Sequence, residues 1–533
     1  MRPLLERLGG FLPAAIALAL PAVFIPNAVD SYILPRASIV ITGSGIGIGL
    51  ALLLPGTRSL GALRIPLIAA AAAASVAFAF SVSWPVSLMG SYTRYESLPI
   101  RLGYLGLLAL PVWLLRDQKW RERVIPAFVF GTVIACIEAL AQQVLLLNHA
   151  IAYRPDGNLG NANLLGALVA MAIPLAVARG LRGGQFLVAW WIGVVVMVGA
   201  LAATTSRSGG LGALAGCLAL VVFRLKGRAV LAGGLVSMVV VGTALLAILF
   251  SPLRLLNDDP GPARLHLWPD AINMIGARPV TGWGEDATGL VYGRFLSGNW
   301  SPEVDRAHSG PLDIAVTQGL LGLAALGWVL LSLARGIWRW RFMGSVGALA
   351  AACIGYSVWV LFNFDWAPAT GAFWLLAGTA WSGVREAEAE SGLRAAAGGD
   401  PGPRPKALRS VGAVGLAVGV VWLGAMPVLA DVWYAHGRLD LAVVADPLQG
   451  RYHWAFGERL VVTGSPSRGV SEMLVASRLG ENNPQLYVDI GDAEQGLGRP
   501  LEARAAYQTA LTIDPFFTPA RQRLAGMGVP ASG

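Results

Sequence analysis

Arg207 lies in the short polar stretch TTSRSGG (204–210), between the apolar runs FLVAWWIGVVVMVGALAA and LGALAGCLALVVF. A guanidinium group stays charged at every accessible pH and binds a phosphate through two parallel N–H donors. Other polar stretches between apolar runs also contain arginines: Arg94, Arg154, Arg254, Arg264, Arg278, Arg294 and Arg306. Any one of them can simply be solvated or extend towards water, but the set predicts an anion-binding site.

His308 is the second candidate for chemistry, because it lies beside Asp305 and Arg306 at the start of an apolar run. A neutral imidazole there could accept a proton from a hydroxyl group, with Asp305 orienting the ring. The alternative is a histidine hydrogen-bonded to the backbone, and the residues alone leave both open. The carboxylates at 258–259 and 285–286 could hold a cation, but no histidine or third carboxylate stands at a helpful spacing, so no metal site is expected.

The elements that must position these side chains are membrane-spanning helices. Of the 533 residues, 55% are hydrophobic and only 13% are charged, whereas about a quarter of a soluble protein is charged. Runs of about 17 or more apolar residues can cross a bilayer. The candidates lie near 11–27, 38–55, 65–83, 99–115, 124–147, 162–178, 186–203, 210–223, 229–250, 311–334, 344–362, 369–383 and 410–430. The predicted fold is therefore all-α, a polytopic membrane domain over residues 1–430 with about 12 to 14 spans.

Basic clusters at the ends of these runs predict the orientation, because cytoplasmic loops are rich in lysine and arginine. A cytoplasmic N-terminus places the clusters RDQKWRER, RLKGR and RGIWRWR together on the cytoplasmic side. The net charge of +9 thus reflects membrane orientation and indicates no nucleic acid partner. The arginines named above then lie on the outer side, where this bias disfavours them. Their retention favours an anionic partner.

Two outer segments are long enough to carry function. The loop 251–310 is by far the longest inside the membrane domain and contains a short helical pattern at 263–277; loops of this length are usually functional. Residues 431–533 have a soluble composition, and 483–517 match one tetratricopeptide unit. Such helix pairs need neighbours, so about three pairs are predicted here as an extracytoplasmic domain. It would bind a partner or cover the site, or it would be a purely structural cap.

Five motifs, in the same order along the chain, resemble the bacterial O-antigen ligase and O-antigen polymerase family, in particular members with a C-terminal tetratricopeptide-like domain. The motifs are GSYTRYESL (90–98), RPDGNLGNANLLG (154–166), TTSRSGGLGALAG (204–216), WPDAINMIGARPVTGWG (268–284) and VDRAHSGPLDIAVTQGLLGL (304–323). The chain departs from the family pattern at Ser309, where asparagine is usual. The GWGED turn also lacks the aromatic residue that often follows it.

The resemblance implies an α-helical membrane fold of the lipid-dependent, GT-C-like glycosyltransferase type. It implies transfer of a glycan at the outer leaflet of the bacterial cytoplasmic (inner) membrane. The donor would be a glycan on a polyprenyl pyrophosphate, typically undecaprenyl, and the acceptor a lipid A-core sugar, another lipid-linked glycan or a protein hydroxyl. No nucleotide sugar, cofactor or obligatory metal is implied.

In such a reaction, arginines would bind the pyrophosphate leaving group, because preorganised cations stabilise the charge that develops on it. The candidates are Arg207 and Arg264, followed by Arg154 and Arg94. His308 would be the base that activates the acceptor hydroxyl, or alternatively a phosphate ligand, with Asp305 as its orienter. The glycines beside Arg207 would let the backbone approach the phosphates closely.

A transporter or flippase of lipid-linked glycans is the alternative from another class. It should carry charged groups through several spans and contain repeated halves, whereas the spans here are nearly free of charge and show no internal repeat. A membrane-anchored scaffold does not explain the long loop with its arginines. Within the enzyme class, a protein O-oligosaccharyltransferase differs only in its acceptor. The sequence therefore predicts a glycan ligase or polymerase with the acceptor left open.

Overall fold

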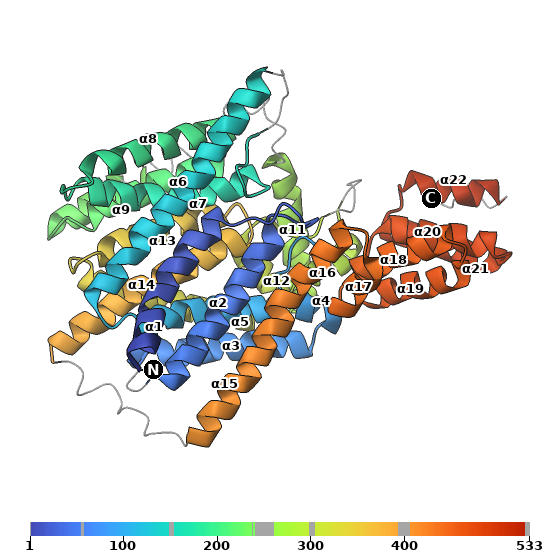
Figure 1. Ribbon diagram of the computed structural model, residues 1–533. Coiled ribbons are helices and arrows are strands. Elements are labelled where there is room, and N and C mark those ends of the chain that lie inside the picture. The colour runs from blue at the N-terminus through green and yellow to red at the C-terminus, as the bar shows by residue number, and fades with distance from the viewer. Residues whose placement is uncertain are drawn as a thin grey trace.

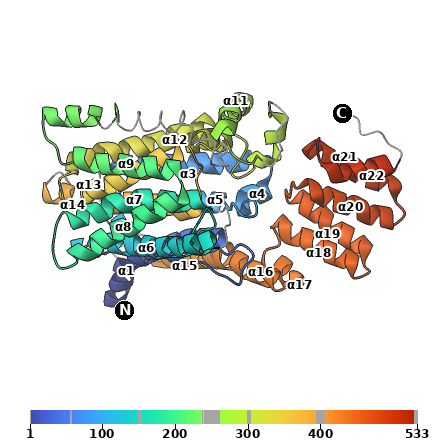
Figure 2. The same cartoon turned by 90° about the horizontal axis from the view of Figure 1, so that it is seen from above.

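The computed structural model describes residues 2–54, 58–148, 154–236, 238–239, 261–297, 304–392 and 406–527. Within these ranges the chain is helical and contains no β-strand, which confirms the predicted all-α class. A bundle of long apolar helices forms most of the molecule, and the shorter C-terminal helices stand beyond one end of it (Figures 1 and 2).

The helices of the bundle are α1 (Arg2–Ala22), α2 (Ile33–Leu53), α3 (Arg64–Ala79), α5 (Leu98–Leu114), α6 (Gln118–Asn148), α7 (Ala162–Gly180), α8 (Leu187–Thr204), α9 (Arg207–Val222), α12 (Gly310–Trp340), α13 (Val346–Val360), α14 (Ala367–Glu390) and α15 (Lys406–Val420). Two further helices, α4 (Trp84–Met89) and α11 (Gly261–Ala277), lie near the end that faces the C-terminal helices (Figure 2).

Eight helical segments of the described chain are long and apolar enough to cross a membrane. Three more apolar helices, α5, α9 and α13, are shorter. Together with α14, these elements correspond to the predicted runs except the one near 229–250, which falls mostly outside the described residues. The chain is a polytopic α-helical membrane protein.

Close backbone contacts between glycines fix α9 in the bundle. A Cβ atom on Gly209 would lie 2.7 Å from the Cα of Gly166 in α7, and one on Gly212 would lie 2.6 Å from the carbonyl oxygen of Gly355 in α13. Lipid gives helices no hydrophobic reason to associate, so small residues that permit close packing supply much of the attraction. This packing also fixes Arg207, the first residue of α9.

The two ends of the bundle hold different segments. One end carries the basic clusters that were predicted to be cytoplasmic, joined by the ion pairs Arg116–Glu6, Arg121–Glu386 and Arg179–Glu122. We call the other end the outer end; it comprises residues 28–32, 90–97, 154–161, 204–209 and 363–366. The predicted inner and outer segments thus lie at opposite ends, and which end faces the cytoplasm stays a prediction.

One continuous helix connects the bundle to the C-terminal part. A π turn (Val421–Ala425) joins α15 directly to α16 (Met426–Ala435), so this helix ends at residue 435 and not at the predicted 430. The remaining helices are α17 (Leu439–Ala445), α18 (Gly450–Val462), α19 (Pro466–Arg478), α20 (Pro484–Gly496), α21 (Pro500–Ile513) and α22 (Thr518–Gly526). α18 packs against α19 and α20 against α21, and the tetratricopeptide assignment of these pairs stays a prediction.

Asp431 on α16 joins the C-terminal part to the outer end. Its fully buried carboxylate accepts hydrogen bonds from the Tyr92 hydroxyl at 2.7 Å, the Tyr452 hydroxyl at 3.1 Å and the Asp30 backbone N–H at 2.8 Å. Tyr452 belongs to α18, whereas Asp30 and Tyr92 belong to loops of the bundle. The loop that contains Tyr92 also carries Arg94, so the C-terminal helices help to hold one of the predicted site residues.

We expect Asp431→Ala to loosen this junction, because each buried donor left without its acceptor costs about 1–3 kcal/mol. Limited proteolysis of the purified protein should release the C-terminal helices at least about tenfold faster. Asp440→Ala is the matched control, since Asp440 is exposed and pairs with exposed Arg438. Equal cleavage rates in both variants would show that Asp431 does not secure the junction.

Candidate functional site

Arg94 lies at the outer end in the loop between α4 and α5, where Thr93 and Tyr95 both adopt positive φ angles of 74° and 58°. Its Nε donates to Oδ2 of Asp305 at 2.5 Å. Its guanidinium group also lies over the rings of Phe364 and Trp366, 4.9 and 4.7 Å from their centroids. The structure therefore brings two of the predicted site residues together, although 211 positions separate them in the sequence.

His308 belongs to the same cluster. It has a positive φ of 52°, and its ring meets Phe364 edge to face at a centroid distance of 5.2 Å. Burial raises the pKa of Asp305, but Arg94 and Arg306 outweigh burial and His308 adds to their effect, so the pKa lies below the ordinary value. Asp305 is thus an ionised carboxylate that pairs with Arg94 within electrostatic range of His308.

Arg207 is the first residue of α9 and not part of a loop, because Ser206 caps the helix with its Oγ accepting from the Gly209 N–H at 3.3 Å. The N-terminus of a helix carries a partial positive charge, which adds to that of Arg207. The next residue, Ser208, accepts a hydrogen bond from Nδ2 of Asn363 at 3.0 Å. The start of α9 therefore adjoins the loop that supports Arg94 and His308.

The two glycines after Ser208 differ in their surroundings. Gly209 touches α7, whereas a Cβ atom on Gly210 would meet no atom within 4 Å. The expectation that both glycines open the backbone to a phosphate therefore needs correction for Gly209, whose missing side chain serves helix packing.

Arg154 braces the turn between α8 and α9. Its Nε donates to the carbonyl oxygen of Thr204 at 2.8 Å and its Nη2 to Oδ1 of Asn163 at 2.9 Å. The same Asn163 oxygen accepts from the Ser206 hydroxyl at 3.1 Å. Arg154 lies beside the start of α9, near Arg207, which agrees with the prediction that several arginines share one site. Part of its guanidinium group, however, is already hydrogen-bonded to Thr204 and Asn163.

Arg264 lies within α11, the helix predicted at 263–277, but its side chain is outside the described residues. The later part of α11 is anchored, since Leu267 and Met274 pack with Trp283 and Tyr292. Of the carboxylates predicted as an alternative cation site, one pair is outside the described residues and the other pair is described. Positions 258–259 lie outside the described residues, whereas Glu285 and Asp286 are each paired with an arginine.

A buried network around Arg101 underlies the outer end. Arg101 pairs with Glu285 at 3.1 Å, Asp365 at 2.5 Å and Glu96 at 3.7 Å. Burial raises the pKa of Glu96 to about 8, against the opposing effect of Arg101. Burial therefore favours the protonated form of Glu96, which reduces the negative charge around the single guanidinium group. The network ties together three loops, those before α5, after α11 and before α14.

Arg306 and Asp286 form a second buried pair, in which 1% of Arg306 and 6% of Asp286 is exposed. Asp286 also accepts from the backbone N–H and the hydroxyl of Ser91, at 2.6 and 2.9 Å. Arg306 was counted among the predicted anion-binding arginines, but in the structure its charge is neutralised by this carboxylate. It holds the segment with Asp305 and His308 against the loop with Arg94.

The sequence reasoning missed the loop Asn363–Trp366, which supports the whole cluster. Asn363 contacts Ser208, and Phe364 contacts both Arg94 and His308. The signal was present in the letters NFDW, where an amide and a carboxylate interrupt two apolar runs. Aromatic residues are frequent at membrane boundaries for reasons unrelated to a site, so the pattern alone was not specific.

The loop 363–366 contacts a cationic helix start through Asn363, and through Phe364 it contacts the cluster with an imidazole, a carboxylate and a guanidinium group. The cationic side can bind a phosphate group. An imidazole near an ionised carboxylate can take a proton from a hydroxyl group. The site therefore has the parts needed to displace an anionic leaving group by a hydroxyl.

Comparison with family models finds a match to the O-antigen ligase model over residues 192–327. This region contains three of the five motifs described above, including those with Arg207 and His308. The match supports the family predicted from the motifs and does not extend to the C-terminal helices. No curated protein matches the chain.

Proposed function

We propose that the chain, which matches the O-antigen ligase model over residues 192–327, is a membrane glycosyltransferase that transfers a glycan from a polyprenyl pyrophosphate to an acceptor hydroxyl at the outer leaflet. The observation that carries the proposal is the junction of the α9 N-terminus with the Arg94–Asp305–His308 cluster through the loop 363–366. Cationic and basic groups thus meet at one end of the bundle, where a lipid headgroup would lie.

The proposed chemistry is a single displacement at the anomeric carbon. The acceptor oxygen forms a bond to that carbon, its proton goes to His308, and the bond to the pyrophosphate oxygen breaks. The pyrophosphate leaves with the electron pair, so its negative charge grows during the reaction. In this proposal Arg207, the start of α9 and Arg264 stabilise that charge. Asp305, paired with Arg94, stabilises the imidazolium that forms.

A flippase remains the competing class, and the geometry favours an enzyme. The proposed reacting groups gather at the outer end, whereas a transport path would need polar groups through the middle of several spans. The proposed site also combines a base with an anion-binding group, which transport does not require.

Reconstitution tests the proposal. The purified protein in liposomes would receive a defined undecaprenyl-pyrophosphate glycan together with a lipid A-core acceptor, a second lipid-linked glycan or a hydroxyl-bearing peptide. Transfer to one of these acceptors, measured by mass spectrometry, would support the enzyme and identify its subclass. Movement of the donor between leaflets without transfer to any acceptor would support the flippase.

In this assay we expect Arg207→Ala to lower kcat/KM by about 100-fold, since one lost donor to a developing charge costs on the order of 3 kcal/mol. Arg207→Lys should lose less, because it keeps the charge but not the planar fork. Arg468→Ala is the control, since Arg468 is exposed near the start of another helix, α19. A rate within about twofold of the unmodified protein would remove Arg207 from the donor site.

A further inference from the structure

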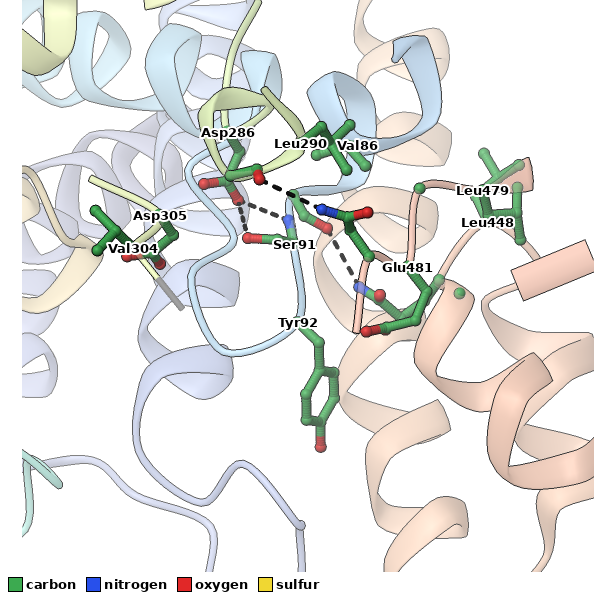
Figure 3. A pocket seen from close by; sticks show the side chains of 16 residues that line it. Val86, Ser91, Tyr92, Asp286, Leu290, Val304, Asp305, Leu448, Leu479 and Glu481 are labelled. Carbon is green, nitrogen blue, oxygen red and sulfur yellow. Dashed lines mark hydrogen bonds between the residues drawn. The ribbon is translucent and has the colours of Figure 1, made fainter. Parts of the chain in front are cut away.

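A cavity of about 200 Å³ lies between the bundle and the C-terminal helices (Figure 3). One wall comes from the bundle and includes Ser91, Asp286 and Asp305. The other wall comes from the C-terminal helices and includes Gln449, Glu481 and Asn482. The volume of the cavity is far larger than the volume that one water molecule needs, so the cavity has room for a small polar group.

The walls are held at a fixed separation by two side-chain amides. Nε2 of Gln449 donates to the carbonyl oxygen of Gly90 at 3.3 Å, and Nδ2 of Asn482 donates to that of Gly289 at 3.4 Å. Figure 3 shows both bonds crossing from the C-terminal helices to the bundle. Each amide has a second N–H and an oxygen, so these residues can also recognise a hydroxyl group.

The cavity differs from the α9 start in the polar groups that it offers to a ligand. Its described lining contains three carboxylates, those of Asp286, Asp305 and Glu481, and no lysine or arginine. Asp286 and Asp305 are paired with Arg306 and Arg94 behind the wall. Glu481 is the carboxylate on the opposite wall. Such a surface offers no cation to a pyrophosphate but accepts hydrogen bonds from sugar hydroxyls.

Asp305 connects the cavity to the proposed reaction. It lines the cavity and pairs with Arg94 in the cluster that contains His308. A group bound in the cavity therefore lies beside Asp305, the carboxylate proposed to stabilise the protonated base. Donor and acceptor would then bind at different surfaces.

We propose that this cavity binds the acceptor as a non-acidic sugar, and that the C-terminal helices supply half of the recognition through Glu481, Asn482 and Gln449. The identification of the sugar as the acceptor rests on the proposed function, whereas the sugar site itself does not. Its described lining offers carboxylates and amides but no cation, so phosphorylated and uronic acid sugars are disfavoured at this position. The C-terminal helices are then part of the enzyme's substrate site.

Binding is tested first without any donor. Saturation-transfer NMR of the full-length protein in nanodiscs would use maltotriose and N,N′,N″-triacetylchitotriose as neutral probes and trigalacturonate as the acidic one. We expect a neutral probe to bind, and the double variant Glu481→Gln/Asn482→Ala to bind it at least about fivefold more weakly. Glu481→Lys should gain binding of trigalacturonate. Glu502→Gln, exposed on α21 of the same helices, is the control.

The outcomes separate this site from the proposed function. Tighter binding of trigalacturonate than of both neutral probes by the unmodified protein, no neutral binding at all, or no effect of the double variant would each overturn the sugar site. In the transfer assay, the double variant should raise the acceptor KM about tenfold and leave the donor KM unchanged. Normal acceptor KM would reject the inference while the transferase stands. Neutral sugar binding without any transfer would reject the transferase while the site stands.

Discussion

Replacing His308 with asparagine is expected to lower the rate of glycan transfer by about two to four orders of magnitude, the usual contribution of a general base. Asparagine suits this position because His308 has a φ of 52°, a conformation in which asparagine is several-fold enriched. The fold should therefore survive while the proton acceptor is lost. The thermal unfolding midpoint, measured beside the transfer rate, checks that the loss is chemical.

The kinetic pattern distinguishes the two roles considered for His308. Loss of a base lowers kcat with little change in the donor KM, whereas loss of a phosphate ligand raises the donor KM. His436→Asn is the control, since His436 is exposed at the end of α16 and its Nδ1 contacts the Val432 carbonyl oxygen. If His308→Asn transfers glycan at the normal rate, His308 has neither role.

The second large effect is on stability. Arg306→Ala should destabilise the protein by about 3–5 kcal/mol, because it leaves the buried carboxylate of Asp286 without a compensating charge. The pair also holds the segment with His308 against the loop with Arg94, so transfer should fall as well. Thermal unfolding in detergent, followed by near-ultraviolet circular dichroism, would measure the change.

A double variant separates the lost charge balance from lost packing. Arg306→Met/Asp286→Asn removes both charges, keeps an acceptor for Ser91 and suits the positive φ of 55° at position 286. It should be clearly more stable than Arg306→Ala. Arg523→Ala, which breaks an exposed pair with Asp492, should cost only about 0–1 kcal/mol. A double variant as unstable as the single one would mean that the ion pair is itself the main source of stability.

Much of the fold was predictable, because crossing a lipid layer imposes a length and an apolar composition that can be read from one sequence. Basic clusters also predicted which segments share an end of the bundle. Helix ends were less accurate: α9 begins at Arg207, three residues before the predicted span. Ser206 starts the helix as its cap, and hydropathy does not detect a cap.

The site was predictable in its residue types and not in its pairings. Arg94, Asp305 and His308 were each identified from local context, and the structure places them in one cluster. The aromatic support from Phe364 and the neutralisation of Arg306 by Asp286 depend on contacts between distant segments. Charge counting treats all outer arginines alike, so it could not separate a buried, paired guanidinium from one available to a ligand.

The π turn at Val421–Ala425 decides how the last helix meets two different partners. A helix that gains one residue must either rotate everything beyond it by about 100° or widen a single turn. This chain has the widened turn, and Gly424 within it lies against Thr42 of α2. The wider turn lets α15 keep its packing against α2, while α16 keeps the orientation that directs Asp431 at its three donors. The single widened turn thus determines how α16 and the helices after it are rotated relative to α15.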